Sequence, residues 1–274
     1  MSEQDNFKTL LDAGAASVEV RSIGNGIPFS IVGEEYHAHN LESFLPVPVR
    51  KRGAIITSDS QGFIDYLNKH STADVSTIYA DIDSEKSRCI LVGVIDDHGK
   101  EGPQWRQHTC TFAPKQAVEW TRWMSMNKKP MKQVDFATWL EDNLTDIASV
   151  DGMPTGADML GMALAFEANY DKRFKSKTNL QSGGVQFEFV DDETKDTRTT
   201  MKAFERFTIG VPVFDGSTSA YPLEARIKYR VAEGAVTFWY ELIRPDRVFK
   251  TAVTDEVAAI KEGTDLQVIS GTAG

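Results

Sequence analysis

The chain of 274 residues has little cysteine, no long apolar run and a deficit of positive charge. Its two cysteines, Cys89 and Cys110, each lie in an apolar segment typical of a strand, where a buried free thiol is the usual state. Two thiols cannot form a disulfide framework or a zinc site built from cysteines. We therefore expect a reducing cytoplasm and a fold stabilised by its core, which a chain of this length can bury without staples.

The other two absences bear on partners. No uncharged apolar run is long enough to span a membrane, and the start, Met-Ser-Glu-Gln-Asp-Asn, lacks the basic and apolar regions of a signal peptide. We therefore expect no membrane partner. Lys and Arg number 30 and Asp and Glu 40, so the net charge is −10. This acidity argues against a general surface for polyanions but permits a local basic stripe.

Catalytic motifs are missing as well. No Ser-His-Asp or Cys-His nucleophile arrangement is recognisable, and the glycines at 24, 26, 183 and 184 lack the strand-turn-helix context of a phosphate loop. We expect a protein that acts by binding and not by catalysis, with no cofactor.

The most informative stretch is a predicted hairpin near the C-terminal end. Residues 223–231 and 235–243 both alternate with period two, and Glu233-Gly234 between them suits a tight turn. Pairing Val231 with Val236 makes one face wholly apolar, whereas a slip of one residue destroys the separation. The resulting pairs are Tyr229–Phe238, Ile227–Tyr240 and Ala225–Leu242 on the apolar face, and Arg230–Thr237, Lys228–Trp239 and Arg226–Glu241 on the polar face.

The remaining patterns predict an α+β fold with mainly antiparallel sheets and a central helical segment. Three consecutive strands at 77–82, 89–95 and 106–112 favour an antiparallel meander. Helices are predicted at 5–20, after a cap at Ser58 or Asp59, at 115–126, after a cap at Asp135, at 155–169 and at 255–262. We divide the chain into an N-terminal arm (1–50), an α+β lobe (51–150) and a β-rich lobe (151–274), the last two separate or one continuous domain.

Several stretches taken together carry a family resemblance. They are His39-Asn-Leu-Glu-Ser-Phe-Leu-Pro46, Val94-Ile-Asp-Asp-His98, Trp105-Arg-Gln-His108, Glu119-Trp120, the helix from Phe136 to Ile147, and Val211-Pro-Val-Phe214 followed by the hairpin. The chain resembles the YfdQ-like family of phage and prophage proteins, a domain of unknown function, over nearly its whole length. The resemblance implies an accessory protein in the cytoplasm of a bacterial host and supplies no catalytic residues.

A first candidate site consists of Asp96, His98 and His108, with Asp97 beside them. If the flanking strands pair, these carboxylates and imidazoles approach one end of the sheet, and such ligands suit a divalent metal in an enzyme. The alternative is a structural loop in which Arg106 pairs with Asp96.

A second candidate is the acidic helix after Asp135. Its carboxylates Glu141, Asp142 and Asp146 are expected to lie on the solvated side of the helix, with no catalytic role.

A third candidate is basic. Arg226, Lys228 and Arg230 project from one face of the hairpin, with Trp239 among them. Cations interleaved with an aromatic ring suit single-stranded nucleic acid, because the charges bind phosphates and the ring stacks on bases. The alternative is internal pairing, with Arg226 bound to Glu241 and Lys228 lying over Trp239 as a cation–π contact.

The last expectation is self-association. The loop-rich arm carries Phe29, Tyr36, Phe44 and Leu45, and Trp105 lies at a loop edge, where an interface would use it. We expect a homo-oligomer whose target is a host or phage protein.

Overall fold

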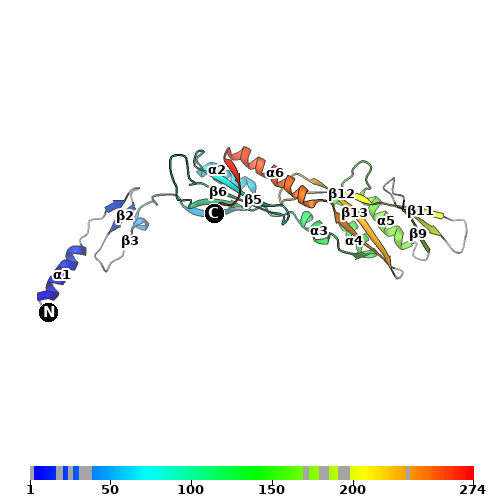
Figure 1. Cartoon of the computed structure of the whole chain (residues 1–274), viewed down its shortest axis with the longest axis horizontal. Helices are drawn as coiled ribbons and strands as arrows, with labels where there is room; N and C mark the ends of the chain where they lie inside the picture. The colour runs from blue at the N-terminus through cyan, green and yellow to red at the C-terminus, as the bar shows by residue number, and fades with distance from the viewer. Residues whose placement is uncertain are drawn as a thin grey trace. The chain divides into compact units, whose positions relative to one another are not determined.

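The computed structural model describes residues 3–16, 21–23, 27–30, 39–168, 173–178, 185–190, 198–232 and 235–274 (Figure 1). The chain divides into two compact units, Met1–Ala54 and Ile55–Gly274, and each is described by itself. Helices and mainly antiparallel sheets confirm the α+β class. Whether residues 51–150 and 151–274 form separate lobes stays a prediction.

The first unit contains one helix and one small sheet. Helix α1 (Glu3–Ala16) is followed by the antiparallel strands β1 (Arg21–Ile23), β2 (Ile27–Ser30) and β3 (His39–Asn40), in that spatial order. The turn before Pro46 is the 3₁₀ helix η1 (Glu42–Phe44). Glu42 is buried, and its carboxylate accepts a hydrogen bond from the Val49 N–H at 3.2 Å and pairs with Arg52 at 3.2 Å.

The second unit contains a five-stranded sheet with the order β15-β5-β6-β7-β4. Its strands are β4 (Gly53–Thr57), β5 (Thr77–Asp83), β6 (Arg88–Val94), β7 (His108–Phe112) and β15 (Gln267–Ser270). The predicted meander is confirmed, because β6 pairs antiparallel with both β5 and β7. Strand β15 joins the sheet parallel to β5.

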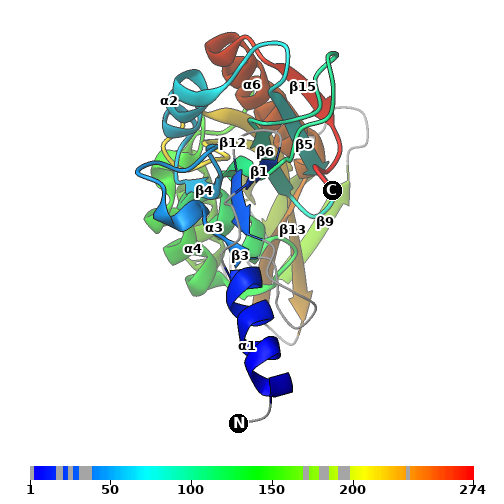
Figure 2. The same ribbon diagram turned by 90° about the vertical axis from the view of Figure 1, so that its left-hand side faces the viewer.

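Helices α2 (Ser60–His70) and α6 (Pro245–Thr264) lie side by side along this sheet (Figures 1 and 2). Asp59 caps α2 by accepting a hydrogen bond from the Gly62 N–H at 2.7 Å, so this predicted cap is confirmed. Helix α6 begins ten residues earlier than predicted. Pro245 follows the hairpin directly and could end it, but proline also suits the first turn of a helix, where its missing N–H costs nothing.

A second sheet has the order β12-β13-β14-β8. Its strands are β12 (Arg206–Val211), β13 (Tyr221–Ala232), β14 (Ala235–Leu242) and the short β8 (Met131–Lys132). Strands β13 and β14 pair in the predicted register, from Ala225–Leu242 to Val231–Val236, and the turn at 233–234 lies outside the described residues. The hairpin prediction is therefore confirmed.

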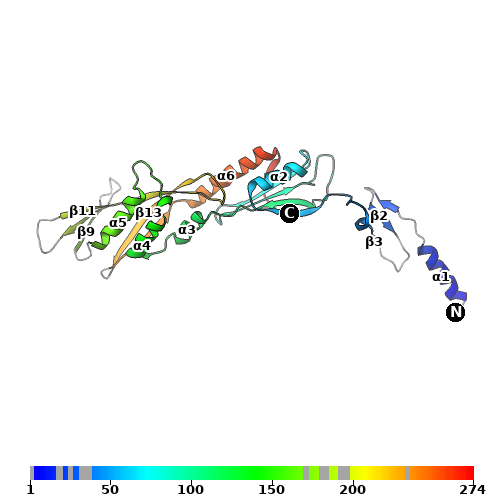
Figure 3. The same cartoon turned by 180° about the vertical axis from the view of Figure 1, so that it is seen from behind.

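Helices cover the apolar side of this hairpin. They are α3 (Val118–Met126) and α4 (Gln133–Asp142), with α5 (Gly156–Ala168) beside α4 (Figure 3). Phe136 of α4 stacks on Phe238 with ring centroids 5.1 Å apart. The Trp123 ring of α3 lies 5.1 Å from the Tyr240 ring, and the Tyr240 hydroxyl donates to the Trp123 carbonyl at 2.6 Å. The aromatic side of the sheet is thus the core of this part of the unit.

Two predictions about the acidic helix are wrong. Asp135 lies in the first turn of α4, whose N-cap residue is Lys132. Asp146 is not solvated: α4 ends at Asp142, the chain turns into the 3₁₀ helix η2 (Leu144–Asp146), and the changed period rotates this carboxylate inward. There Asp146 accepts a hydrogen bond from the buried Trp123 indole N–H at 2.8 Å.

A third sheet contains β9 (Arg173–Thr178), β10 (Val185–Val190) and β11 (Arg198–Ala203), all antiparallel. The segment at 179–184 between β9 and β10 lies outside the described residues.

Candidate functional site

The outer face of the β13–β14 hairpin is basic. Because side chains alternate along a strand, burial of Ile227 and Phe238 on the inner face leaves Arg226, Lys228 and Arg230 exposed on the outer face. Trp239 lies directly across from Lys228 and is half-buried. The structure therefore brings together all four residues predicted for the basic candidate.

The expected internal pairing of this face is absent from the part of the chain that the structure describes. No ion pair there joins Arg226 to Glu241, although the two residues face each other in the register. The Glu241 carboxylate instead accepts a hydrogen bond from the Trp239 indole N–H at 3.3 Å. Within the same described residues, Lys228 makes no cation–π contact with Trp239. The positive charge of this face is left for solvent or a ligand.

The sheet adds two cations that the sequence did not predict. Arg206 of β12 faces Arg226, and Lys132 of β8 faces Thr237, so both share the outer face. Arg206 pairs with Glu224 at 3.5 Å, but both side chains are about half exposed, and such surface pairs contribute little. Period-two alternation could not reveal Lys132, because β8 has only two residues.

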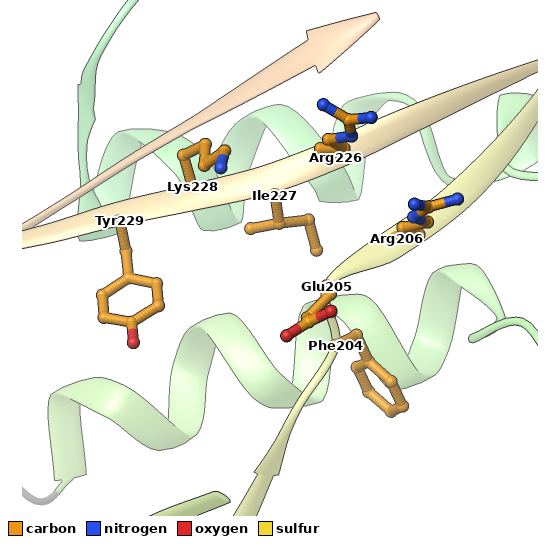
Figure 4. Close-up of a pocket in the computed structure, with 7 residues that line it drawn as sticks. All are labelled: Phe204, Glu205, Arg206, Arg226, Ile227, Lys228 and Tyr229. Carbon is orange, nitrogen blue, oxygen red and sulfur yellow. The ribbon is translucent and has the colours of Figure 1, made fainter. Parts of the chain in front are cut away.

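A cavity of about 480 Å³ opens beside these cations. Its lining residues come from β13 and from the segment that enters β12: Phe204, Glu205, Arg206, Arg226, Ile227, Lys228 and Tyr229 (Figure 4). Figure 4 shows Arg226 and Lys228 on one side of β13, and Ile227 and Tyr229 on the other side with the Glu205 carboxylate. Burial, and then the nearby Glu205 charge, raise the pKa of Tyr229, so its hydroxyl keeps its proton.

The residues of the predicted metal site are occupied with other partners. The Asp96 carboxylate accepts hydrogen bonds from the N–H groups of Gln107 (3.0 Å) and His108 (2.8 Å). His98 Nδ1 accepts from the Gln104 N–H at 3.1 Å, and His108 Nε2 lies 2.8 Å from the Tyr66 hydroxyl. Among the described residues, no three His, Cys, Asp or Glu side chains are grouped so as to hold a metal ion.

Asp97, and not Asp96, pairs with Arg106. The buried Asp97 carboxylate lies 3.0 Å from the Arg106 guanidinium and accepts a hydrogen bond from the Tyr79 hydroxyl at 2.8 Å. Burial alone would raise the pKa of Asp97, but the hydrogen bonds from Tyr79 and the His98 N–H lower it overall. Arg106 also donates to the Ala273 carbonyl, so this cluster fastens the C-terminal segment to the loop.

The predicted interface residues are only partly described. The side chain of Phe44 is 83% exposed and that of Trp105 is 63% exposed. Leu45 lines a separate hollow of about 310 Å³ in the first unit. The side chain of Phe29 and all of Tyr36 lie outside the described residues.

The fold and site define an α+β protein whose antiparallel sheet buries one aromatic face and exposes one basic face. The chain belongs to DUF2303, a family described as an uncharacterized conserved protein, whose family model matches residues 1–273. No curated protein and no solved structure matches the chain. Among the described residues, no helix has the length and apolar character needed to cross a membrane.

Proposed function

We propose that the outer face of the β13–β14 hairpin binds single-stranded nucleic acid. The observation that carries this proposal is that Arg226, Lys228 and Arg230 are exposed without an ion pair among the described residues. Alternate residues of a strand lie about 6.6 Å apart, since each residue advances the chain by about 3.3 Å. A row of cations with that spacing can follow the phosphates of an extended strand, as binders of single strands do.

The surroundings of the row support the same ligand. Trp239 offers an indole face among the cations, and aromatic rings contribute to binding by stacking on unpaired bases. The overall charge of −10 limits nonspecific attraction elsewhere on the chain, so the local row would select where a polyanion binds.

Fluorescence anisotropy with a labelled oligonucleotide tests the proposal. A length of about 15 nucleotides suits one such site. The wild type is compared with the double variant Lys228→Glu/Arg230→Glu. We expect the variant to bind at least about tenfold more weakly, because it removes two phosphate contacts and adds two repulsive charges.

The matched control is Lys100→Glu/Lys250→Glu, which changes the net charge equally at two exposed lysines away from the hairpin. Equal weakening in both double variants would show that only total charge matters and would refute the site. Circular dichroism confirms that each variant is folded.

A second proposal, self-association, is supported by helix α1. Its residues Phe7, Leu10 and Leu11 share one side of the helix, and their side chains are 68%, 70% and 61% exposed. A helix of 14 residues is marginal in water by itself, so packing against α1 of a second copy would stabilise it. Leu10→Glu should lower the molar mass measured by light scattering, while Thr9→Glu on the opposite side should not. A wild-type protein that is monomeric at low micromolar concentration would refute this proposal.

The setting that we propose follows from the resemblance to YfdQ-like proteins. It is that of a phage or prophage accessory protein in the bacterial cytoplasm, with a host or phage protein as a further partner. A pull-down from host lysate, repeated with nuclease, would separate a protein partner from one bridged by nucleic acid.

A further inference from the structure

We propose that the cavity beside the cations accepts one unstacked base that carries an exocyclic amino group, with the Glu205 carboxylate as the hydrogen-bond acceptor. This inference rests on the proposed function, because the cations of the same face would hold the phosphates of the strand that supplies the base.

The position of Glu205 is fixed by the backbone. The Ile227 N–H donates to the Glu205 carbonyl at 2.9 Å, which continues the β12–β13 ladder by one pair beyond Arg206. The neighbouring Phe204 N–H lies 3.4 Å from the Met162 sulfur of α5. The carboxylate is therefore attached to a short segment held at both residues, which limits the conformational cost of using it in recognition.

The carboxylate is available for a ligand. Glu205 is half-buried, and no hydrogen bond or ion pair of its side chain is found among the described residues. A carboxylate only accepts hydrogen bonds, so it favours a partner with an N–H donor. The nearest cation along the strand, Arg206, is paired with Glu224.

The volume and lining of the cavity suit a nucleic-acid base. Its volume of about 480 Å³ lies within the usual range for small-molecule sites. On the side of β13 where Glu205 lies, the cavity wall is apolar and consists of Phe204, Ile227 and Tyr229. Arg226 and Lys228 lie on the other side, so a strand could cross β13 with its phosphates on the cations and one base turned toward Glu205 (Figure 4).

The chemistry discriminates between two pyrimidines of nearly equal shape. Cytosine carries an amino group at C4, and this group can donate a hydrogen bond to a glutamate carboxylate. Thymine carries a carbonyl oxygen there, which a carboxylate repels. Chain flexibility alone would favour oligodeoxythymidine, because its bases stack least on one another and its backbone bends most easily. The predicted preference for cytosine is the opposite order of affinity.

The test compares labelled oligodeoxycytidine and oligodeoxythymidine of about 15 nucleotides by anisotropy at one salt concentration. We expect the wild type to bind oligodeoxycytidine at least about fivefold more tightly. Glu205→Gln should reduce this ratio to near one, since the amide both donates and accepts. Glu262→Gln, which removes an exposed carboxylate of α6 that does not line the cavity, should leave the ratio unchanged.

The outcomes separate the two proposals. Equal binding of both oligonucleotides by the wild type, still weakened by Lys228→Glu/Arg230→Glu, would overturn the base pocket and leave the basic face standing. Retention of the ratio in folded Glu205→Gln would overturn the role of Glu205. If neither oligonucleotide binds the wild type, the proposed function fails and the pocket fails with it.

Discussion

The salt dependence of binding can be predicted from the cations on the hairpin. Three of them, Arg226, Lys228 and Arg230, have no ion pair among the described residues and are available for phosphates. Each phosphate contact with a single strand contributes a slope of about −0.7 to log K against log salt. Three contacts give a slope of about −2, so affinity should fall about 20-fold between about 50 mM and about 200 mM salt.

Replacing one cation should change this slope by a defined step. In Lys228→Gln we expect a slope of about −1.4 and a fall of only about sevenfold over the same salt range. Anisotropy titrations at four or five salt concentrations measure both slopes. The control Lys250→Gln, on the exposed side of α6, should keep the wild-type slope. A wild-type slope near zero, or one that Lys228→Gln leaves unchanged, would refute the counting of phosphate contacts on this face.

Other predictions concern the core that holds the hairpin in place. Tyr240→Phe removes the donor to the Trp123 carbonyl and should lower the free energy of unfolding by about 1–2 kcal/mol in urea titrations; an unchanged midpoint would contradict that bond. Asp146→Ala leaves the Trp123 indole N–H without its acceptor and should cost about 1–3 kcal/mol, whereas Asp146→Asn, which keeps an acceptor oxygen, should cost less. Burial raises the pKa of the Cys89 and Cys110 thiols from 9.0 to about 11. Unfolded thiols then lose their protons first, so the free energy of unfolding should hold below pH 9 and fall as the pH rises from 9 to 11. Urea titrations at pH 8 and pH 10 measure the fall, which should be smaller in Cys110→Ala.

The hairpin was predictable because its signal is local and repeated. Two segments of nine residues alternate with period two, and only one register separates apolar from charged side chains. The same alternation predicts that one face of the hairpin carries Arg226, Lys228, Arg230 and Trp239.

The rest of the candidate site depends on contacts between distant segments. Glu205 and Arg206 reach the cavity because β12 pairs with β13 across the loop at 212–220, and no local pattern sets that register. The internal pairing of Arg226 with Glu241 was a reasonable expectation from their opposed positions. In the structure the Glu241 carboxylate instead accepts a hydrogen bond from the Trp239 indole N–H, two residues away on the same strand.

Errors in the helices have equally specific causes. The prediction that Asp146 is solvated required the α-helical period of 3.6 residues to continue to this residue. The chain changes to a 3₁₀ helix at Leu144, so that period does not apply to Asp146. The length of α6 was underestimated because Pro245 can end a strand as well as begin a helix.

Ultraviolet cross-linking of the wild type to oligodeoxycytidine, followed by mass spectrometry of the peptides, tests the central claim most directly. It asks where a bound strand lies without changing any residue. We predict cross-links on peptides that contain Trp239 of β14 and Tyr229 of β13, with few elsewhere. Cross-links confined to peptides outside β12, β13 and β14 would contradict the claim that this basic face is the binding surface.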